Sequence, residues 1–555
     1  MQSDLTELTP SAYTYPLLIK RLLHTPLMHA PNQEVVYRDR VRMTYSKVYE
    51  RIAQLANGLT KLGVEMGTTV AVMDWDSHRY LECYFAVPMM GAVLQTVNVR
   101  LSQAEIAYTL NHAGAEILLV HTDFLPVVEA IKDKLESVRQ FVWISDEGDE
   151  RSPHTIPFSG EYEGLLASSS SSYDFPDFDE NTRATTFYTT GTTGMPKGVY
   201  FSHRQLVLHT ISVMAALSSP ESEQRFHRGD VYMPLTPMFH VHAWGMPYIA
   251  TVLGVKQVYP GRYIPDQIVK LVRDEGVTFS HCVGTILHML LNCAEGKEAD
   301  FSEWKVVIGG GALTQGLARA ALDRGIDVFT GYGMSETCPI LTLAQSKPGY
   351  ASLEIEDQVA IRCKTGLPVP LVELRIVDEN MQDVAQDGSA SGEVVVRAPW
   401  LTQGYLKNPD ASEQLWEGGY LHTQDIARID RAGYLQVTDR IKDVIKSGGE
   451  WVSSLEVEGL ISQHPGVAEV AVIGVKDEKW GERPAALVVR KMDGTVFVSE
   501  EEIRQHVLTF SEKGTISKYA VPQTIKFVDA LEKTSVGKLN KKWLREKFAE
   551  TDSGG

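Results

Sequence analysis

The feature that most constrains the fold of this chain is the alternation of amphipathic helices with short apolar strands. Apolar residues recur at helical spacing over residues 45–62, and Gly63 follows them. Three strand-like runs come next, with helix-like segments between them, at residues 69–73, 91–97 and 116–120. This order predicts parallel β-α-β units with helices on both faces of the sheet.

The pattern also divides the chain. A serine-rich, acidic connection at residues 146–180 interrupts the alternation, which then resumes and gives way to short strands with tight turns from about residue 369. Beyond residue 439 the chain has the pattern of a separate α+β module. We therefore expect an α/β protein with a large N-terminal domain, residues 1–438, of doubly wound mixed sheets plus a small β-rich subdomain. A smaller α+β C-terminal domain, residues 439–555, follows.

Composition excludes several classes of protein. A chain of 555 residues is too long for one hydrophobic core, and its net charge of −18 argues against a general nucleic-acid binder. The five cysteines are scattered without a CxxC pair, so neither a disulfide framework nor a zinc site is expected. The polar N-terminus lacks the features of a signal peptide, and no apolar run is long enough to span a membrane. A cytoplasmic protein is the expectation.

Residues 188–198, YTTGTTGMPKG, follow a strand-like run and suit a polyphosphate ligand. Glycines bring backbone N–H groups close to a ligand, threonines add hydroxyl donors, and Lys197 supplies a positive charge. The loop is not a Walker loop, because Gly198 rather than Ser or Thr follows the lysine. A threonine-rich surface hairpin is the alternative.

Two further glycine-rich loops follow strand-like runs, at residues 309–312 and 331–337. In open α/β sheets, ligands bind at the edge where such loops gather. A carboxylate such as Glu336 would repel a phosphate unless a cation lay between them, and Mg²⁺ is the natural bridge. Without that context, Glu336 could equally be a solvated loop charge and Tyr332 a packing residue.

Five segments in a fixed order carry a resemblance to a known family: YTTGTTGMPKG, GYGMSET, YLHTQD, DRIKDVIKSGGEW and KTSVGK. Together they closely resemble the adenylate-forming acyl-CoA synthetase superfamily, from about Leu17 to Phe548. The segments SGGEWVSSLEVE and PMFHVHAWGMPY are most similar to its fatty acyl-CoA synthetase branch.

The resemblance implies a two-step ligase reaction with ATP, Mg²⁺ and coenzyme A. A carboxylate attacks the α-phosphate of ATP to give acyl-AMP and pyrophosphate, and coenzyme A then displaces AMP to form a thioester. The C-terminal domain is mobile in this family, and its members are often dimeric. Contact with a membrane surface is left open.

Nucleotide-binding roles follow from the same resemblance. The β- and γ-phosphates are expected at Thr189, Thr190, Gly191, Thr192, Thr193 and Lys197, with Thr189 and Glu336 as the residues of the metal site. Adenine is expected to stack on Tyr332, between Gly331 and Gly333, with Ser335 beside it, Thr337 on the α-phosphate, and Gly311 and Ala312 along the adenine and acyl walls. Asp425 would accept hydrogen bonds from the ribose, assisted by Arg440. Lys442 lies at the hinge position, and Lys446, Gly449 and Trp451 would contact nucleotide.

The resemblance also indicates catalytic and acyl-binding residues. Lys538 would bridge the acyl carboxylate and the α-phosphate, a role that suits a compact charge on a long stem. His240 would line the place where the thiol meets the acyl carbonyl, and Trp244 is similar to a gate over the acyl tunnel. The expected acyl pocket comprises His240, Val241, Trp244, Val283, Gly310 and Met334.

This expected wall is largely apolar and contains no lysine or arginine, which argues against dicarboxylic acids. A medium- or long-chain fatty acid is the first expectation, and a short or substituted acid of the branched, aryl or methylthiopropionate type is the second. Three other classes are weighed: an adenylation module of a peptide-synthesis assembly line, a non-catalytic nucleotide binder, and a luciferase-like enzyme. The retained motifs disfavour the binder, and a peptide-synthesis module would normally be followed by a carrier domain, which is not expected here.

Overall fold

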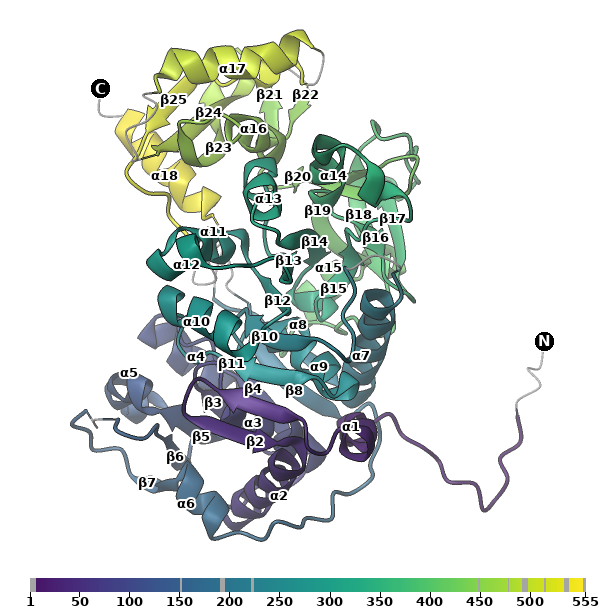
Figure 1. Ribbon diagram of the computed structural model, residues 1–555, viewed down its shortest axis with the longest axis vertical. Coiled ribbons are helices and arrows are strands. Elements are labelled where there is room, and N and C mark those ends of the chain that lie inside the picture. Colours follow the sequence, from purple (N-terminus) through teal and green to yellow (C-terminus); the bar gives the residue numbers. More distant parts are fainter. Residues whose placement is uncertain are drawn as a thin grey trace.

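The computed structural model describes residues 6–149, 152–189, 195–220, 224–447, 450–477, 479–491, 498–513, 516–533 and 539–552. Four sheets of seven, nine, four and five strands form its framework. The first two fill the lower and middle parts of the molecule in Figure 1, and the last lies at the top. Among the described residues, no helix is both long and apolar enough to cross a membrane.

The seven-stranded sheet has the order β7-β6-β5-β3-β4-β8-β9, parallel throughout except for the antiparallel pair β8–β9. Its strands are β3 (Thr69–Met73), β4 (Val93–Thr96), β5 (Ala115–His121), β6 (Gln140–Ile144), β7 (Phe158–Glu161), β8 (Arg183–Tyr188) and β9 (Gly198–Ser202). The accompanying helices are α2 (Tyr45–Lys61), α3 (His78–Met89), α4 (Gln103–Ala113), α5 (Leu125–Ile131) and α6 (Tyr162–Ala167). The predicted parallel β-α-β units are confirmed.

The nine-stranded sheet has the order β16-β15-β14-β13-β12-β10-β11-β1-β2, with a parallel centre and antiparallel ends. Its strands are β1 (Glu34–Tyr37), β2 (Val41–Thr44), β10 (Val231–Leu235), β11 (Lys256–Tyr259), β12 (Phe279–Cys282), β13 (Lys305–Ile308), β14 (Asp327–Gly333), β15 (Ile340–Leu343) and β16 (Leu367–Pro368). The helices of this part are α1 (His24–His29), α7 (His203–Ser218), α8 (Val241–Trp244), α9 (Met246–Leu253), α10 (Pro265–Glu275), α11 (Gly284–Asn292), α12 (Ala294–Glu298), α13 (Gln315–Leu322) and α14 (Ile355–Arg362).

The predicted β-rich subdomain is a four-stranded antiparallel sheet. It consists of β17 (Glu373–Val377), β18 (Gly392–Arg397), β19 (Leu421–Ile429) and β20 (Leu435–Arg440), with α15 (Pro409–Leu415) before β19. The remaining sheet is built from β21 (Ile445–Ser447), β22 (Glu450–Val452), β23 (Val467–Asp477), β24 (Gly481–Arg490) and β25 (Thr524–Phe527). Its helices are α16 (Ser454–Ile461), α17 (Glu500–Glu512) and α18 (Lys541–Asp552).

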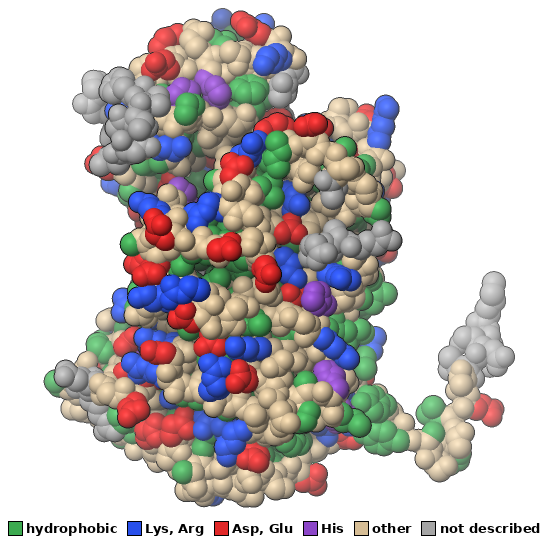
Figure 2. Space-filling model, in the orientation of Figure 1, with side chains coloured by type: hydrophobic (Ala, Val, Ile, Leu, Met, Phe, Trp, Pro, Cys, Tyr) green, Lys and Arg blue, Asp and Glu red, His purple; other side chains and the backbone are tan. Residues whose placement is uncertain are grey.

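The C-terminal part, the yellow-green layer at the top of Figure 1, is attached to the body by polar contacts around β20. Arg428 of β19 pairs with Glu456 of α16 at 3.3 Å, and the Ser453 hydroxyl donates a hydrogen bond to the carbonyl of Thr438 in β20. Charged side chains of both signs are mixed over the face of the molecule shown in Figure 2. The contact between the body and the C-terminal part is therefore polar here, unlike the cores on either side.

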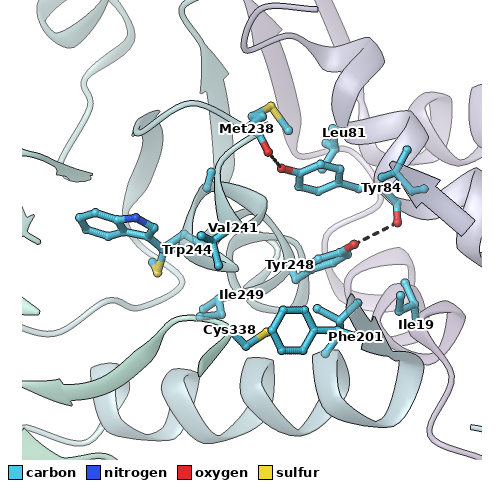
Figure 3. Packing of buried hydrophobic residues seen from close by; sticks show 14 of the residues in the cluster. Ile19, Leu81, Tyr84, Phe201, Met238, Val241, Trp244, Tyr248, Ile249 and Cys338 are labelled. Carbon is cyan, nitrogen blue, oxygen red and sulfur yellow. Dashed lines mark hydrogen bonds between the residues drawn. The ribbon is translucent and has the colours of Figure 1, made fainter. Parts of the chain in front are cut away.

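An aromatic core lies beneath the ligand-binding edge of the two large sheets. The Tyr248 hydroxyl donates a hydrogen bond to the carbonyl of Tyr84, and the Tyr84 hydroxyl donates to the carbonyl of Met238, as Figure 3 shows. These bonds tie α3 of the first sheet to the segment that follows β10 of the second sheet. The core thus fixes the position of the loop that carries His240.

Candidate functional site

Three residues expected to bind nucleotide, Tyr332, Asp425 and Arg440, come together from distant parts of the chain. We call them the nucleotide wall. Tyr332, at the end of β14, donates a hydrogen bond to Asp425 of β19, with 2.7 Å between its hydroxyl oxygen and Asp425 Oδ2. The Nε of Arg440 lies 3.3 Å from the other oxygen of this carboxylate. Burial and the neighbouring Asp425 charge raise the pKa of Tyr332, so the phenol stays protonated and acts as a donor. The wall presents an aromatic face beside a paired carboxylate.

Lys442 belongs to the same charge cluster. Burial and the nearby Arg440 lower the pKa of Lys442, and the carboxylates of Asp443 and Asp425 act in the opposite direction. The expected hinge residue therefore interacts electrostatically with the expected ribose-binding residue. Lys446 pairs with Trp451 across the β21–β22 hairpin, and its backbone N–H donates to Glu482.

Glu336 and Lys197 meet around a tyrosine that the sequence motifs do not include. The Tyr405 hydroxyl lies 2.7 Å from Oε1 of Glu336, and the ammonium of Lys197 lies 4.5 Å from the centroid of the Tyr405 ring. The Glu336 carboxylate is buried, and within the described part of the chain no basic side chain forms a salt bridge with it. The Glu336 carboxylate is therefore available to bind a cation.

Hydrogen bonds and close packing within the loop that carries Glu336 fix the conformation of this loop. The Thr337 hydroxyl donates within the loop to the carbonyls of Met334 and Pro339 and accepts from the Met334 N–H, while Ser335 begins the same turn. A side chain at Gly333 would place its Cβ 1.7 Å from the carbonyl oxygen of Pro339. Gly333 is thus required by the fold, whatever ligand lies nearby. A Cβ at Gly331 would meet Val307 at 2.9 Å.

Several predicted site residues lie outside the described residues: Thr190, Gly191, Thr192, Thr193, Gly449 and Lys538, while for Trp451 only the backbone is described. The segment at residues 188–198 is here called the phosphate loop. At its base, the Thr189 N–H donates to the carbonyl of Lys197 at 3.0 Å, which continues the β8–β9 ladder. Gly311 and Ala312 are exposed after β13. The described ends of the phosphate loop therefore place Thr189 and Lys197 opposite each other.

A small cavity of about 50 Å³ lies at the expected acyl site. Its lining residues are Arg100, Leu235, Thr236, Pro237, His240, Trp244, Tyr263, Val283, Thr285, Ile286 and Gly310. Four expected acyl residues, His240, Trp244, Val283 and Gly310, are among them. Val241 instead points into the aromatic core in Figure 3, and Met334 packs against the same core.

The expectation that this wall has no basic side chain is wrong, because Arg100 lines the cavity. Behind it lies Asp76, which accepts hydrogen bonds from the Tyr263 hydroxyl at 2.6 Å and the Met238 N–H at 2.8 Å. Burial raises the pKa of Asp76 to about 7, against the opposing effect of the nearby Arg100 charge. One wall of the cavity is therefore polar, and the absence of a basic residue no longer counts against a polar acid.

The loop after β10 takes an unusual path. Val241, His242, Ala243 and Trp244 all have positive φ, between 46° and 60°, and Gly245 continues the turn at 73°. Left-handed turns cost L-residues about 1–2 kcal/mol each, so the surrounding core must hold this one in place. The turn buries His242 and aims the Trp244 indole at Gly309, where an added Cβ would lie 2.7 Å from the ring.

Four residues of the site were missed by the sequence motifs: Arg100, Asp76, Tyr263 and Tyr405. None of them belongs to the motifs quoted above, and each reaches the site only through tertiary contacts. Tyr405 and Glu336, for example, are 69 positions apart. Spacing along the chain gave no signal for these partners.

Sequence comparisons with known proteins identify the family. The model of the AMP-binding enzyme family matches residues 25–406, and the model of the AMP-binding enzyme C-terminal domain matches residues 456–538. A long-chain-fatty-acid–CoA ligase of Thermus thermophilus is 41% identical over 510 residues, 91% of this chain and 90% of that protein. A 3-methylmercaptopropionyl-CoA ligase of Ruegeria lacuscaerulensis is 36% identical over 549 residues, covering 98% of this chain and 99% of that protein.

Solved structures agree over the whole length. The anthranilate CoA ligase AuaEII in complex with anthranoyl-AMP is similar with a TM-score of 0.83 and 25% identity, over 97% of this chain and 99% of that chain. A Mycobacterium tuberculosis fatty acyl CoA synthetase has a TM-score of 0.69 and 28% identity, over 96% and 99%. Together with the site geometry, these matches show that the chain belongs to the AMP-binding enzyme family.

Proposed function

We propose that the protein is an ATP-dependent acid–thiol ligase, which activates a carboxylic acid as acyl-AMP and transfers the acyl group to coenzyme A. The observation that carries the proposal is the convergence of Tyr332, Asp425 and Arg440 on one side and Glu336 with Lys197 on the other. An aromatic face, a ribose-binding carboxylate and a phosphate-binding cation suit an adenine nucleotide.

In this proposal each residue has a defined task. Tyr332 stacks on adenine, Asp425 accepts hydrogen bonds from the ribose hydroxyls, and Arg440 pairs with the Asp425 carboxylate and orients it. Lys197 and the threonine loop hold the β- and γ-phosphates. Because negative charge accumulates as the carboxylate attacks the α-phosphate, positioned cations and donors lower the barrier.

The donor set fits a magnesium ion. Glu336 is a buried carboxylate without a salt bridge among the described residues, and Mg²⁺ prefers one or two carboxylates together with phosphate oxygens. Glu336 and Thr189 would hold the ion, which would supply charge neutralisation for the phosphates. The expected role of Thr337 toward the α-phosphate would require one of its present bonds to be given up, because its hydroxyl and its backbone N–H are both bonded within the loop.

The proposed acid is a medium- or long-chain fatty acid, since much of the cavity wall is apolar, including Leu235, Val283 and Ile286. The second candidate is a short or substituted acid of the methylthiopropionate type. Two observations favour it: Arg100 makes one wall polar, and the chain is 36% identical to a ligase named for such an acid. Each buried methylene contributes about 0.8 kcal/mol, so selectivity for chain length is gradual.

The test is AMP release measured across straight-chain acids from three to eighteen carbons, together with 3-methylthiopropionate and a dicarboxylic acid, with ATP and coenzyme A present. A maximum at eight carbons or more supports the fatty-acid proposal. A maximum at 3-methylthiopropionate supports the second candidate, and no release with any acid contradicts both. A cytoplasmic location, contact with a membrane surface and a homodimeric state remain predictions.

A further inference from the structure

Residues 402–406, here called the strap, connect two parts of the nucleotide site through backbone bonds. The Thr402 N–H donates to the carbonyl of Glu336 at 2.9 Å. The Leu406 N–H donates to the carbonyl of Gly198, the residue after Lys197, at 2.8 Å. The strap therefore touches both the metal-binding loop and the exit of the phosphate loop.

The strap is itself firmly held. The Thr402 hydroxyl donates to the carbonyl of Tyr200 at 3.0 Å, and the indole of Trp416 donates to the carbonyl of Thr402 at 3.1 Å. At Gly404, an added Cβ would lie 2.4 Å from the hydroxyl oxygen of Ser412. Such a closely packed segment can hold a side chain in a fixed direction.

That side chain is Tyr405, which reaches both functional groups at once. Its hydroxyl donates to Glu336 Oε1 at 2.7 Å, and its ring lies 4.5 Å from the ammonium of Lys197. A hydrogen bond to a metal-binding carboxylate orients it, and an aromatic face attracts and aligns an ammonium group.

We propose that Tyr405 is a positioning residue, which directs the Glu336 carboxylate toward the metal and the Lys197 ammonium toward the phosphates. It orients these two groups and takes no part in the chemistry. The inference rests on the ATP site of the proposed function and is independent of which acid is activated. Its two halves are separable, because the hydroxyl serves Glu336 and the ring serves Lys197.

Two variants separate these halves. Tyr405→Phe keeps the ring and removes the hydroxyl, whereas Tyr405→Leu removes both. Tyr434→Phe is the matched control: its hydroxyl donates to the carbonyl of Gln345 at 2.9 Å, and two lysines lie 5.3 Å from its ring, but none of these contacts involves a predicted site residue.

The measurements are Mn²⁺ binding to the ATP-bound protein by electron paramagnetic resonance, and ATP binding in EDTA by calorimetry. We expect Y405F to raise the Mn²⁺ dissociation constant about tenfold while leaving metal-free ATP affinity unchanged, because outer-shell partners typically change metal affinity 10–100-fold. Y405L should in addition weaken metal-free ATP binding about twofold to fivefold, the range of an exposed cation–π contact. Y434F should match the wild type in both measurements.

Unchanged Mn²⁺ affinity in Y405F would overturn the role toward Glu336, and equal metal-free ATP affinity in Y405F and Y405L would overturn the role toward Lys197. If either variant is less stable, the rise in unfolding temperature on adding Mn²⁺ to the ATP-bound protein still isolates the metal effect. Failure of the wild type to bind Mn²⁺ and ATP would instead contradict the proposed ATP site. Neither measurement involves the acid or coenzyme A.

Discussion

At the scale of single residues, the proposed nucleotide binding depends most on the pairing of Asp425 with Tyr332 and Arg440. We expect Asp425→Asn to weaken ATP binding about tenfold or more, because hydrogen bonds to a charged group contribute about 1.5–3 kcal/mol. Calorimetric titration with ATP measures the change. Asp430→Asn is the control. Asp430 lies in the turn between β19, which carries Asp425, and β20, which carries Arg440, and it pairs with Lys364 at 2.6 Å. Equal ATP affinity in both variants would contradict the assignment.

The positions of the motif residues could be predicted from the sequence, whereas most of their partners could not. Glu336 lies in a glycine-rich loop whose residue types indicate phosphate chemistry, and the ribose role of Asp425 follows from the resemblance of its segment to the family. Tyr405 and Arg100 lie in ordinary segments and acquire their roles only when the sheets assemble. Such contacts depend on tertiary packing, which local composition does not encode.

At the scale of helices and strands, the period of the hydrophobic pattern was a reliable guide. Strand β3 has the predicted bounds, and α2 ends one residue before the predicted segment does. The turn at Val241–Trp244 was not predictable, because L-residues without glycine rarely adopt positive φ. The core that forces this conformation is built from residues far away in the sequence.

Buried histidines give the stability of the protein a dependence on pH. Burial lowers the pKa of four of them, His203, His209, His242 and His281, to about 3, from an ordinary value of 6.5. Between pH 3 and pH 6.5 these histidines are protonated in the unfolded chain and neutral in the folded protein. The free energy of unfolding is therefore retained above pH 6.5 and falls below it, by about 1.4 kcal/mol per pH unit for each histidine.

Urea unfolding between pH 5 and pH 7.5 measures this slope. His242→Phe should reduce the slope by the amount that corresponds to the uptake of one proton on unfolding. The reason is that His242 is fully buried and neither ring nitrogen has a hydrogen-bond partner among the described residues. Substitution of the exposed His29 should leave the slope unchanged. A slope that is the same in His242→Phe and the wild type would show that His242 does not remain neutral in the folded protein.

At the scale of the whole molecule, the proposed chemistry is shared between the body and the C-terminal part. The nucleotide wall and the acyl cavity belong to the body, whereas Lys538 belongs to the C-terminal sequence and lies outside the described residues. The polar contacts of Arg428 with Glu456 and of Ser453 with Thr438 suit a connection that is rearranged between steps, because interfaces of this kind are more readily separated than apolar ones. We propose that the boundary between the two domains lies at residues 438–439.

The most direct test of the account compares the two half-reactions in the wild type and in Lys538→Ala. Pyrophosphate release from ATP and acid reports acyl-AMP formation, and thioester formation from supplied acyl-AMP and coenzyme A reports the second step. The account predicts that the wild type catalyses both, releases AMP in repeated turnovers only when coenzyme A is present, and that Lys538→Ala loses the first step while largely retaining the second. Turnover of AMP by the wild type without coenzyme A, or equal loss of both steps in Lys538→Ala, would contradict it.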